Sequence, residues 1–353
     1  MESIRINLFS DTQTQPPPGM RQAMAEAEVG DEQYLLDPSV NRLCEEVAAR
    51  LGKDKAMFLP SGTMCNQIAL AVHCASGDEI IADRTAHIVN SEAAGSAVVA
   101  GAAIRALNGE RGIFQPADVE ASLRAGRALE PRSRLVVVEQ TSNGGGGSIW
   151  PLATLVGVAE VARGHGLALH MDGARLLNAA VASGTAACDF ADPVDSVWLD
   201  LSKGLGCPVG AVLAGSDAFI REAWRWKHRL GGAMRQAGIL AAAGSWALAH
   251  HVDRLAEDHD NARSFAQRIE SIEGVTILNP EVETNLVFFD VAGTGQSSKD
   301  VTARLREHGV WIGANGPTRM RAVTHLGVGK PAVDEAARPD AALTKTNTII
   351  AGA

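Results

Sequence analysis

The 353-residue sequence has little aromatic content, with a single tyrosine, whereas glycine occurs 36 times. This balance indicates many tight turns and close contacts between helices and a sheet, and argues against an all-β sandwich. The sequence also lacks a tract of basic residues, and its net charge is −9. Because nucleic-acid binding needs clustered Lys and Arg, we expect no nucleic-acid partner.

Three sequence signals of other protein classes are missing as well. The five cysteines are scattered and show no CxxC spacing, which is typical of reduced thiols in a cytosolic protein. The first twenty residues lack the basic-then-apolar plan of a signal peptide, and no run of about 18 apolar residues could span a bilayer. We therefore expect a soluble cytoplasmic protein with no membrane partner.

Short apolar runs alternate with helical patterns along most of the chain. The runs predicted to be strands are residues 79–83, 135–140, 167–172, 196–201 and 209–215, with helices at 66–74 and 152–165. This alternation predicts an α/β fold with a mostly parallel sheet. We expect an N-terminal arm and a large domain at residues 1–254 and a smaller α+β domain at 255–353. The polar tail from Lys330 onward is predicted to be partly disordered.

Polar residues lie at or just after the ends of three of these predicted strands, at the edge where ligands bind in such sheets. They are the segment 139–143 (EQTSN), Asp172 and Lys203. Lys203 could be an ordinary surface lysine. However, the apolar run before it and the GLGCPVG segment after it favour a partly desolvated amine next to a ligand. Such an amine is suited to Schiff-base chemistry with a carbonyl cofactor.

Asp172 and two further segments suggest which cofactor that is. Asp172 could cap a helix, or it could hold the protonated ring nitrogen of pyridoxal phosphate. Gly62 and Thr63 lie in a PSGT turn before a helical stretch, which suits a phosphate but is also an ordinary helix cap. His87 follows a strand at a distance that fits a ring stacked over the cofactor, or it is a satisfied structural histidine.

A metal site is the alternative of a different class, formed by His250, His251, Asp258 and His259. Adjacent helical residues point about 100° apart, so the two neighbouring histidines cannot face one ion together. The sequence therefore predicts no metal site, and a surface helix accounts for these residues.

Seven collinear motifs between about residues 6 and 327 carry a family resemblance. The chain resembles the low-specificity L-threonine aldolase and β-eliminating lyase family of pyridoxal phosphate (PLP) enzymes, which have the fold-type I, aspartate aminotransferase-like architecture. In that fold, helices sandwich a mostly parallel mixed sheet. The motifs are SDTQTQP, AEVGDEQY with DPSVNRL, FLPSGTMCNQIAL, HMDGARLLNAAVA, LSKGLGCPVGAVLAG, LGGAMRQAG and RAVTHL.

The resemblance implies a role for each residue at the cofactor. It places a PLP Schiff base on Lys203, Asp172 at the ring nitrogen and His87 against the ring. It also places the phosphate on Gly62 and Thr63. These assignments make Lys203, His87 and Asp172 the expected catalytic residues.

The resemblance also implies a substrate site, with Arg175 beside the cofactor and the substrate carboxylate, and Arg321 and Ser10 on that carboxylate. Arginine geometry suits bidentate capture of a carboxylate. The expected reaction is cleavage of a β-hydroxy-α-amino acid, such as threonine, allo-threonine or phenylserine, to glycine and an aldehyde. Members of the family usually share active sites between subunits, so a homodimer or homotetramer is expected.

One departure from the family pattern bears on this reaction. Ser142 stands where the family usually has a histidine linked to the β-hydroxyl of the substrate. Serine cannot act unaided as a general base at neutral pH, so water, His87 or another group must take that role. The alternative is β-elimination, or another lyase or racemase reaction, on a related amino acid. A PLP-binding protein without catalytic activity is a further alternative.

Overall fold

The computed structural model describes residues 4–279 and 281–338 and divides the chain into two units. The larger unit is Thr14–Leu255, and the smaller combines Met1–Gln13 with Ala256–Ala353. The whole N-terminal arm was expected in the large domain, whereas its first 13 residues group with the C-terminal segment. They belong with the C-terminal segment because strand β1 (Ile6–Asn7) pairs in parallel with β11 (Val310–Trp311).

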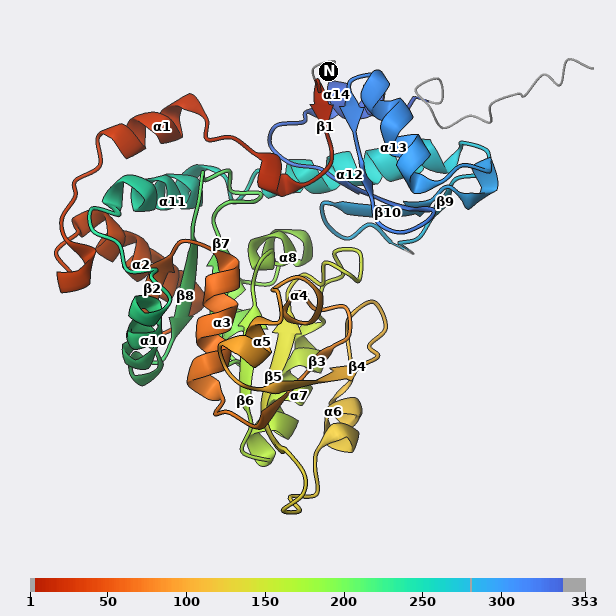
Figure 1. The fold of residues 1–353 in the computed structure, drawn as a ribbon. Helices are drawn as coiled ribbons and strands as arrows, with labels where there is room; N and C mark the ends of the chain where they lie inside the picture. The colour runs from red at the N-terminus through yellow and green to blue at the C-terminus, as the bar shows by residue number, and fades with distance from the viewer. Residues whose placement is uncertain (1–3, 280, 339–353) are drawn as a thin grey trace, which may run out of the picture. The chain divides into compact units, whose positions relative to one another are not determined.

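A seven-stranded mixed sheet forms the centre of the larger unit (Figure 1). Its order is β2-β8-β7-β6-β5-β3-β4, and β8 is antiparallel to both of its neighbours. The strands are β2 (Lys55–Leu59), β3 (Asp78–Asp83), β4 (Ala103–Leu107), β5 (Arg132–Glu139), β6 (Ala168–Asp172), β7 (Ser196–Asp200) and β8 (Ala211–Gly215). The five strands predicted from apolar runs are all present, and β2 and β4 are additional.

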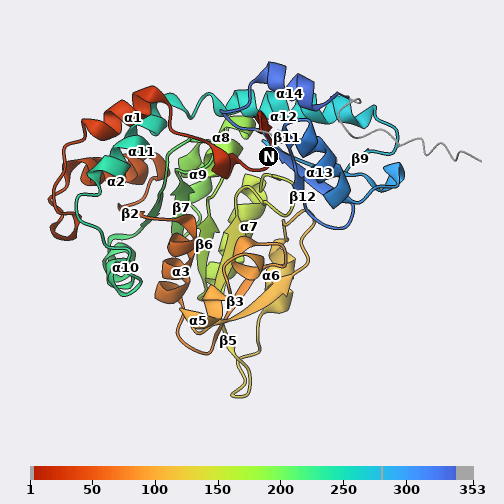
Figure 2. The same cartoon turned by 45° about the horizontal axis from the view of Figure 1, so that its top comes forward.

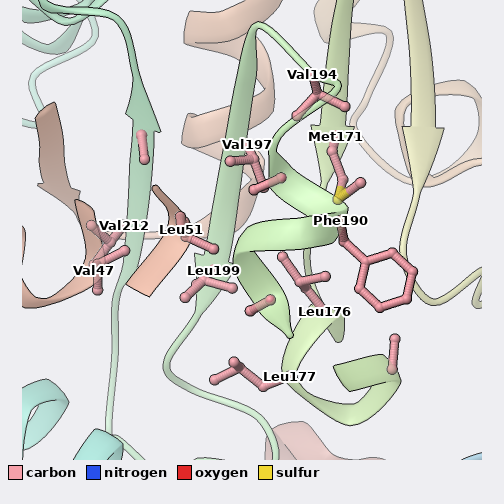
Figure 3. Packing of buried hydrophobic residues seen from close by; sticks show 14 of the residues in the cluster. Val47, Leu51, Met171, Leu176, Leu177, Phe190, Val194, Val197, Leu199 and Val212 are labelled. Atoms are coloured by element: carbon pink, nitrogen blue, oxygen red, sulfur yellow. The ribbon is translucent and has the colours of Figure 1, made fainter. Parts of the chain in front are cut away.

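Helices cover both faces of this sheet because successive strand residues belong to hydrophobic clusters on opposite faces. Val197 and Leu199 of β7 pack into the cluster shown in Figure 3, whereas Trp198 belongs to a second cluster on the opposite face. The first cluster includes residues of α2 (Pro38–Leu51), α7 (Leu152–Gly164), α8 (Leu176–Ser183) and α9 (Ala187–Ala191). The second includes residues of α3 (Gly62–His73) and α10 (Asp217–Arg229).

The remaining helices of the larger unit are short or lie outside these layers. Helix α11 (Gly238–His250) packs against both α1 (Pro18–Ala25) and α2, as Figure 2 shows. Its apolar side chains therefore pack against other helices of this chain, and alanines such as Ala243 are buried. The short helices are η2 (Glu32–Tyr34), α4 (His87–Asn90), α5 (Gly95–Val98) and α6 (Pro116–Ser122).

The smaller unit is an α+β arrangement around its own hydrophobic core. A four-stranded sheet has the order β12-β13-β10-β9 and is antiparallel throughout. Its elements are η1 (Asp11–Gln13), α12 (Leu255–Glu270), β9 (Thr276–Ile277), β10 (Leu286–Asp290), η3 (Ala292–Thr294), α13 (Ser298–Glu307), β12 (Gly313–Ala314), β13 (Arg319–Val323) and α14 (Lys330–Ala336).

The start of the C-terminal tail differs from the sequence-based expectation. Residues Lys330–Ala336 form helix α14, and Val333 and Ala336 are buried in the core of the smaller unit. This spacing of three residues places both side chains on one helix face. Helix α14 is thus an ordered part of the tail that was predicted to be partly disordered, and the tail from residue 339 lies outside the described residues.

Two expectations about the whole chain can be compared with the structure. All five cysteines are free thiols, as their spacing indicates. Within the described ranges, no helix combines the length and the apolar composition needed to cross a membrane.

Candidate active site

Asp172 ends β6 and is held by two hydrogen-bond donors. Its Oδ2 accepts from Nδ2 of Asn66 at 2.8 Å, and its Oδ1 accepts from the backbone N–H of Ala174 at 3.0 Å. The side chain is buried, and both contacts suit an ionised carboxylate. The alternative interpretation of Asp172 as a simple helix cap does not hold, because helix α8 begins four residues later and Arg175 is its N-cap residue.

His87 begins helix α4 and lies in a cluster of acidic groups. Its Nδ1 lies 2.8 Å from Oε1 of Glu92, and its backbone N–H donates to Glu139 at 2.7 Å. The hydrogen bond to Glu92 raises the pKa of His87. Burial and repulsion from Asp172 raise the pKa of Glu139 to about 7. A titratable ring and a carboxyl group that titrates near neutrality thus lie within one hydrogen-bonded group.

Lys203 follows β7 and forms an ion pair with Asp200. The distance from Nζ to Oδ2 of Asp200 is 2.9 Å, and the two side chains are 19% and 6% exposed. Ser202 donates to the other carboxylate oxygen of Asp200 from both its backbone N–H and its hydroxyl. The amine also lies 5.7 Å from the centre of the Trp198 ring. The interpretation as a freely solvated surface lysine is therefore excluded.

The N-terminus of α3 lies on the same indole ring. A Cβ atom added to Gly62 would lie 2.1 Å from Cη2 of Trp198, so glycine is required for this close approach. Ser61 caps the helix by accepting from the N–H of Met64 at 3.2 Å. By helix geometry, the N–H groups of Gly62 and Thr63 have no carbonyl partner within α3, which leaves them available to an anion.

Trp198 connects these elements because its Nε1–H donates to Oδ1 of Asn66 at 2.7 Å. Through this contact, Lys203 and the N-terminus of α3 are linked to Asn66 and so to Asp172. Residues separated by more than a hundred positions in the sequence are thereby brought together in the larger unit.

Ser142 lies in the loop after β5 and faces the protein interior. It is 2% exposed, and its hydroxyl accepts from the N–H of Gly145 at 3.2 Å. A Cβ atom added to Gly112 would lie 2.0 Å from this hydroxyl, so the two segments are in close contact. The serine is thus enclosed by backbone rather than presented to an open space.

Arg175 is buried at the start of α8. Its Nη1 lies 3.5 Å from Oδ1 of Asn143, and its backbone N–H donates to the carbonyl of Gln140. Arg175, Asp200 and Lys203 line one small cavity. The structure thus brings the arginine to the same region as the lysine.

Ser10 and Arg321 belong to the smaller unit. Nη2 of Arg321 lies 3.5 Å from the carbonyl oxygen of Phe9, so the arginine reaches the segment that contains Ser10. The Ser10 hydroxyl accepts from the hydroxyl of Thr12 at 2.8 Å, and Ser10 is 6% exposed. The neighbouring basic residue of β13, Arg319, is instead stacked 4.0 Å over the ring of Phe288.

Sequence reasoning did not identify Asn66, Asp200, Glu92 or Glu139 as members of this site. Glu139 had appeared only as the start of a strand-end segment. Asn66 lies inside a helical pattern, and neither Asp200 nor Glu92 belongs to a local motif, so no short-range signal distinguishes them from structural polar residues.

The histidines considered for a metal site have other partners. Nδ1 of His250 lies 2.7 Å from the carbonyl oxygen of Trp246, and Nδ1 of His251 lies 2.6 Å from that of Leu205. Among the residues that the structure describes, a group with ligand atoms within 4.8 Å of one another is formed instead by His87, Glu92 and Asp172. The amide of Asn66 already donates to both of these carboxylates.

The chemistry of this donor set fits pyridoxal phosphate. The cofactor needs an amine for its aldehyde, a carboxylate for its ring nitrogen and a site for its phosphate. Lys203, Asp172 and the N-terminus of α3 offer these three features within one unit, and His87 adds an aromatic ring. The fold and the site together define an α/β enzyme with a lysine-centred site.

Comparison with known proteins gives the family. A model of the beta-eliminating lyase family matches residues 7–293. The chain is 38% identical over 325 residues to low-specificity L-threonine aldolase 1 of Arabidopsis thaliana, with 91% of each chain covered. It is also 38% identical over 345 residues to the low specificity L-threonine aldolase of Escherichia coli (strain K12), covering 94% of this chain and 97% of that one. The chain belongs to the beta-eliminating lyase family and is a lyase.

Solved structures agree on the fold. The threonine aldolase of Leishmania major matches with a TM-score of 0.79 at 20% identity, covering 94% of this chain and 97% of that one. A putative L-allo-threonine aldolase from Listeria monocytogenes EGD-E matches with a TM-score of 0.76 at 23% identity, covering 95% and 92%. The fold is fold-type I of the pyridoxal phosphate enzymes, as the motifs predicted.

Proposed function

We propose that this protein uses pyridoxal phosphate to cleave a β-hydroxy-α-amino acid to glycine and an aldehyde. The observation that carries the proposal is the convergence of Lys203, Asp172, His87 and the N-terminus of α3 around Asn66 and Trp198. The relatives named as low-specificity L-threonine aldolases, which align over nearly the whole chain, support the choice of reaction.

In this proposal, each residue acts on a defined part of the cofactor. Lys203 would hold the aldehyde, Asp172 would pair with the ring nitrogen, and Gly62 and Thr63 would bind the phosphate. A cofactor held there would supply an electron sink for cleavage of the bond between Cα and Cβ of the substrate. His87 would pack against the ring.

Two arginines and a serine are proposed to hold the substrate. The resemblance assigns Arg321 and Ser10 to the carboxylate of the amino acid and Arg175 to the cofactor and substrate. A carboxylate held by a bidentate arginine contact fixes which bond of the substrate is aligned for cleavage.

The group that removes the proton of the β-hydroxyl is proposed to be His87. The buried hydroxyl of Ser142 faces backbone atoms, whereas His87 keeps 38% of its side chain exposed. Because its hydrogen bond to Glu92 raises the pKa of His87, the neutral ring that accepts a proton forms only above that raised value. Cleavage should therefore increase as the pH rises through this pKa. We expect His87→Phe, which keeps a stacking ring, to abolish this rise, and an unchanged pH profile would contradict the assignment.

The alternative reaction is β-elimination, which releases a keto acid and ammonia. The replacement of the usual family histidine by a buried serine favours it, because the contact to a β-hydroxyl is lost. The deciding experiment is product analysis of the purified protein with pyridoxal phosphate and L-threonine, L-allo-threonine or L-phenylserine. Glycine plus an aldehyde supports the proposal, and a keto acid with ammonia refutes it.

The matched control for this experiment is Lys203→Ala. We expect it to lose both the absorbance of the attached cofactor and the product. A variant that retained the spectrum of a covalently attached cofactor would show that another residue carries it.

The proposed homodimer or homotetramer is tested separately, by gel filtration with light scattering, and a fully active monomer would refute it.

A further inference from the structure

Asn66 is a fully buried residue in α3 whose side chain has four hydrogen-bond partners. Its Nδ2 lies 2.7 Å from Oε1 of Glu92 and 2.8 Å from Oδ2 of Asp172. Its Oδ1 lies 2.7 Å from Nε1 of Trp198 and 3.2 Å from Nε2 of His170. An indole nitrogen only donates, so the amide oxygen must face it and the amide nitrogen must face the two carboxyl groups. The full hydrogen-bonding capacity of the amide is therefore used.

A chain of buried groups behind Asn66 fixes this orientation further. Because Nε2 of His170 donates to Asn66, its Nδ1 accepts from the hydroxyl of Ser196 at 2.8 Å. That hydroxyl oxygen in turn accepts from Nε2 of His73, also at 2.8 Å. Burial lowers the pKa of His170 to about 3 and that of His73 to about 4, so each ring is neutral and carries one N–H. One arrangement of protons satisfies the whole chain.

The two carboxyl groups that Asn66 contacts act on different parts of the proposed cofactor site. Asp172 is assigned to the ring nitrogen, and Glu92 bonds Nδ1 of His87, which is assigned to the ring face. We infer that Asn66 is a positioning residue that holds Asp172 directly, and His87 through Glu92, in the orientation that receives the pyridoxal phosphate ring. This inference rests on the proposed function.

A purely structural role for Asn66 is the competing explanation, because removing its amide leaves buried donors and acceptors without partners. Both roles predict a less stable protein, but only the positioning role predicts a specific change at the cofactor. The experiment compares Asn66→Ala with Ser196→Ala, which breaks the same chain at a residue three hydrogen bonds away from Asp172. Each variant of the full chain is measured by thermal unfolding without cofactor and by titration with pyridoxal phosphate. The ¹⁵N chemical shift of the ring nitrogen is recorded with labelled cofactor.

We expect both variants to unfold at lower temperature than the wild type. We expect Asn66→Ala alone to weaken cofactor binding at least about tenfold, or about 1.4 kcal/mol, and to move the ring-nitrogen signal toward that of an unprotonated ring. Wild-type affinity and an unchanged signal in Asn66→Ala would overturn the inference. If Asn66→Ala does not fold, Asn66→Ser keeps one donor, and the same criteria apply to it.

A double-mutant cycle with Asp172→Asn tests whether Asn66 acts through Asp172. We expect Asn66→Ala to change the affinity of the Asp172→Asn variant for pyridoxal phosphate less than about threefold. A tenfold loss in both backgrounds would instead show an independent structural effect and overturn the inference. A wild-type protein that does not take up pyridoxal phosphate would refute the proposed function, and this inference with it. Normal wild-type binding with no effect of Asn66→Ala would refute the inference alone.

Discussion

The substitution Gly62→Ala tests the packing beneath the candidate phosphate site. The added Cβ would lie 2.1 Å from Cη2 and 2.4 Å from Cζ3 of Trp198. The indole is 2% exposed, and its Nε1–H is bonded to Asn66 at 2.7 Å. It therefore cannot turn away without losing a buried hydrogen bond, and the new methyl group must displace α3 or β7.

The expected loss of stability follows from two opposing effects. Replacing glycine by alanine in a helix stabilises it by up to about 1 kcal/mol, and less at the first turn. Overpacking a well-filled core costs about 1 to 3 kcal/mol, and the lack of a free direction for Trp198 places this case at the upper end. We expect Gly62→Ala to lower the free energy of unfolding by about 2 kcal/mol. For a unit of this size, that corresponds to about 4 to 8 °C in the melting temperature.

The assay is urea unfolding of the protein without cofactor, so that loss of phosphate binding does not contribute. Gly164→Ala is the matched control, because a Cβ at this helical glycine would meet no atom within 4 Å, and it should be neutral or slightly stabilising. Combining Gly62→Ala with Trp198→Phe removes the outer atoms of the indole and should recover at least about 1 kcal/mol of the penalty. The reasoning is refuted if Gly62→Ala unfolds at the wild-type midpoint, or if its penalty is the same beside Trp198→Phe.

Two further predictions concern titratable groups inside the protein. Lys227 is 0% exposed and paired with Glu32 at 2.9 Å, so Glu32→Ala leaves an uncompensated ammonium group and should cost about 3 to 5 kcal/mol in urea unfolding. The exposed Arg221→Ala should barely move the midpoint, and equal effects of the two variants would contradict this prediction. Burial lowers the pKa of His170 to about 3 and that of His73 to about 4, so the unfolded chain binds protons below about pH 6.5 that the folded chain does not. The free energy of unfolding should therefore fall as the pH falls from about 6.5 toward 4. The variant His73→Gln should lose less of this free energy over the same range. An identical pH dependence of the variant and the wild type would show that this ring is not held neutral.

Much of the fold could be predicted because its signals are local. Apolar runs of strand length mark β3, β5, β6, β7 and β8, and their alternation with helices limits the sheet to a mostly parallel one. Lys203 and Asp172 were predicted for the same reason, since each lies at or just after the end of such a run. The strand β2 begins with the exposed Lys55, and β4 contains no fully buried residue, so neither has the continuous apolar pattern of a central strand.

The sequence by itself determined which residues are candidates for the chemistry, because lysine, aspartate and a glycine-containing helix start are recognisable from their immediate neighbours. Only the tertiary structure decided how those groups are held. Asn66 meets Asp172 across 106 positions and Trp198 across 132, and no local pattern records such contacts. The surroundings of the Ser142 hydroxyl also depend on tertiary structure, since the turn at Gly112 lies against it. The order of strands in the sheet decides which elements lie side by side, and therefore which buried side chains can form hydrogen bonds. That order is a property of the folded chain as a whole.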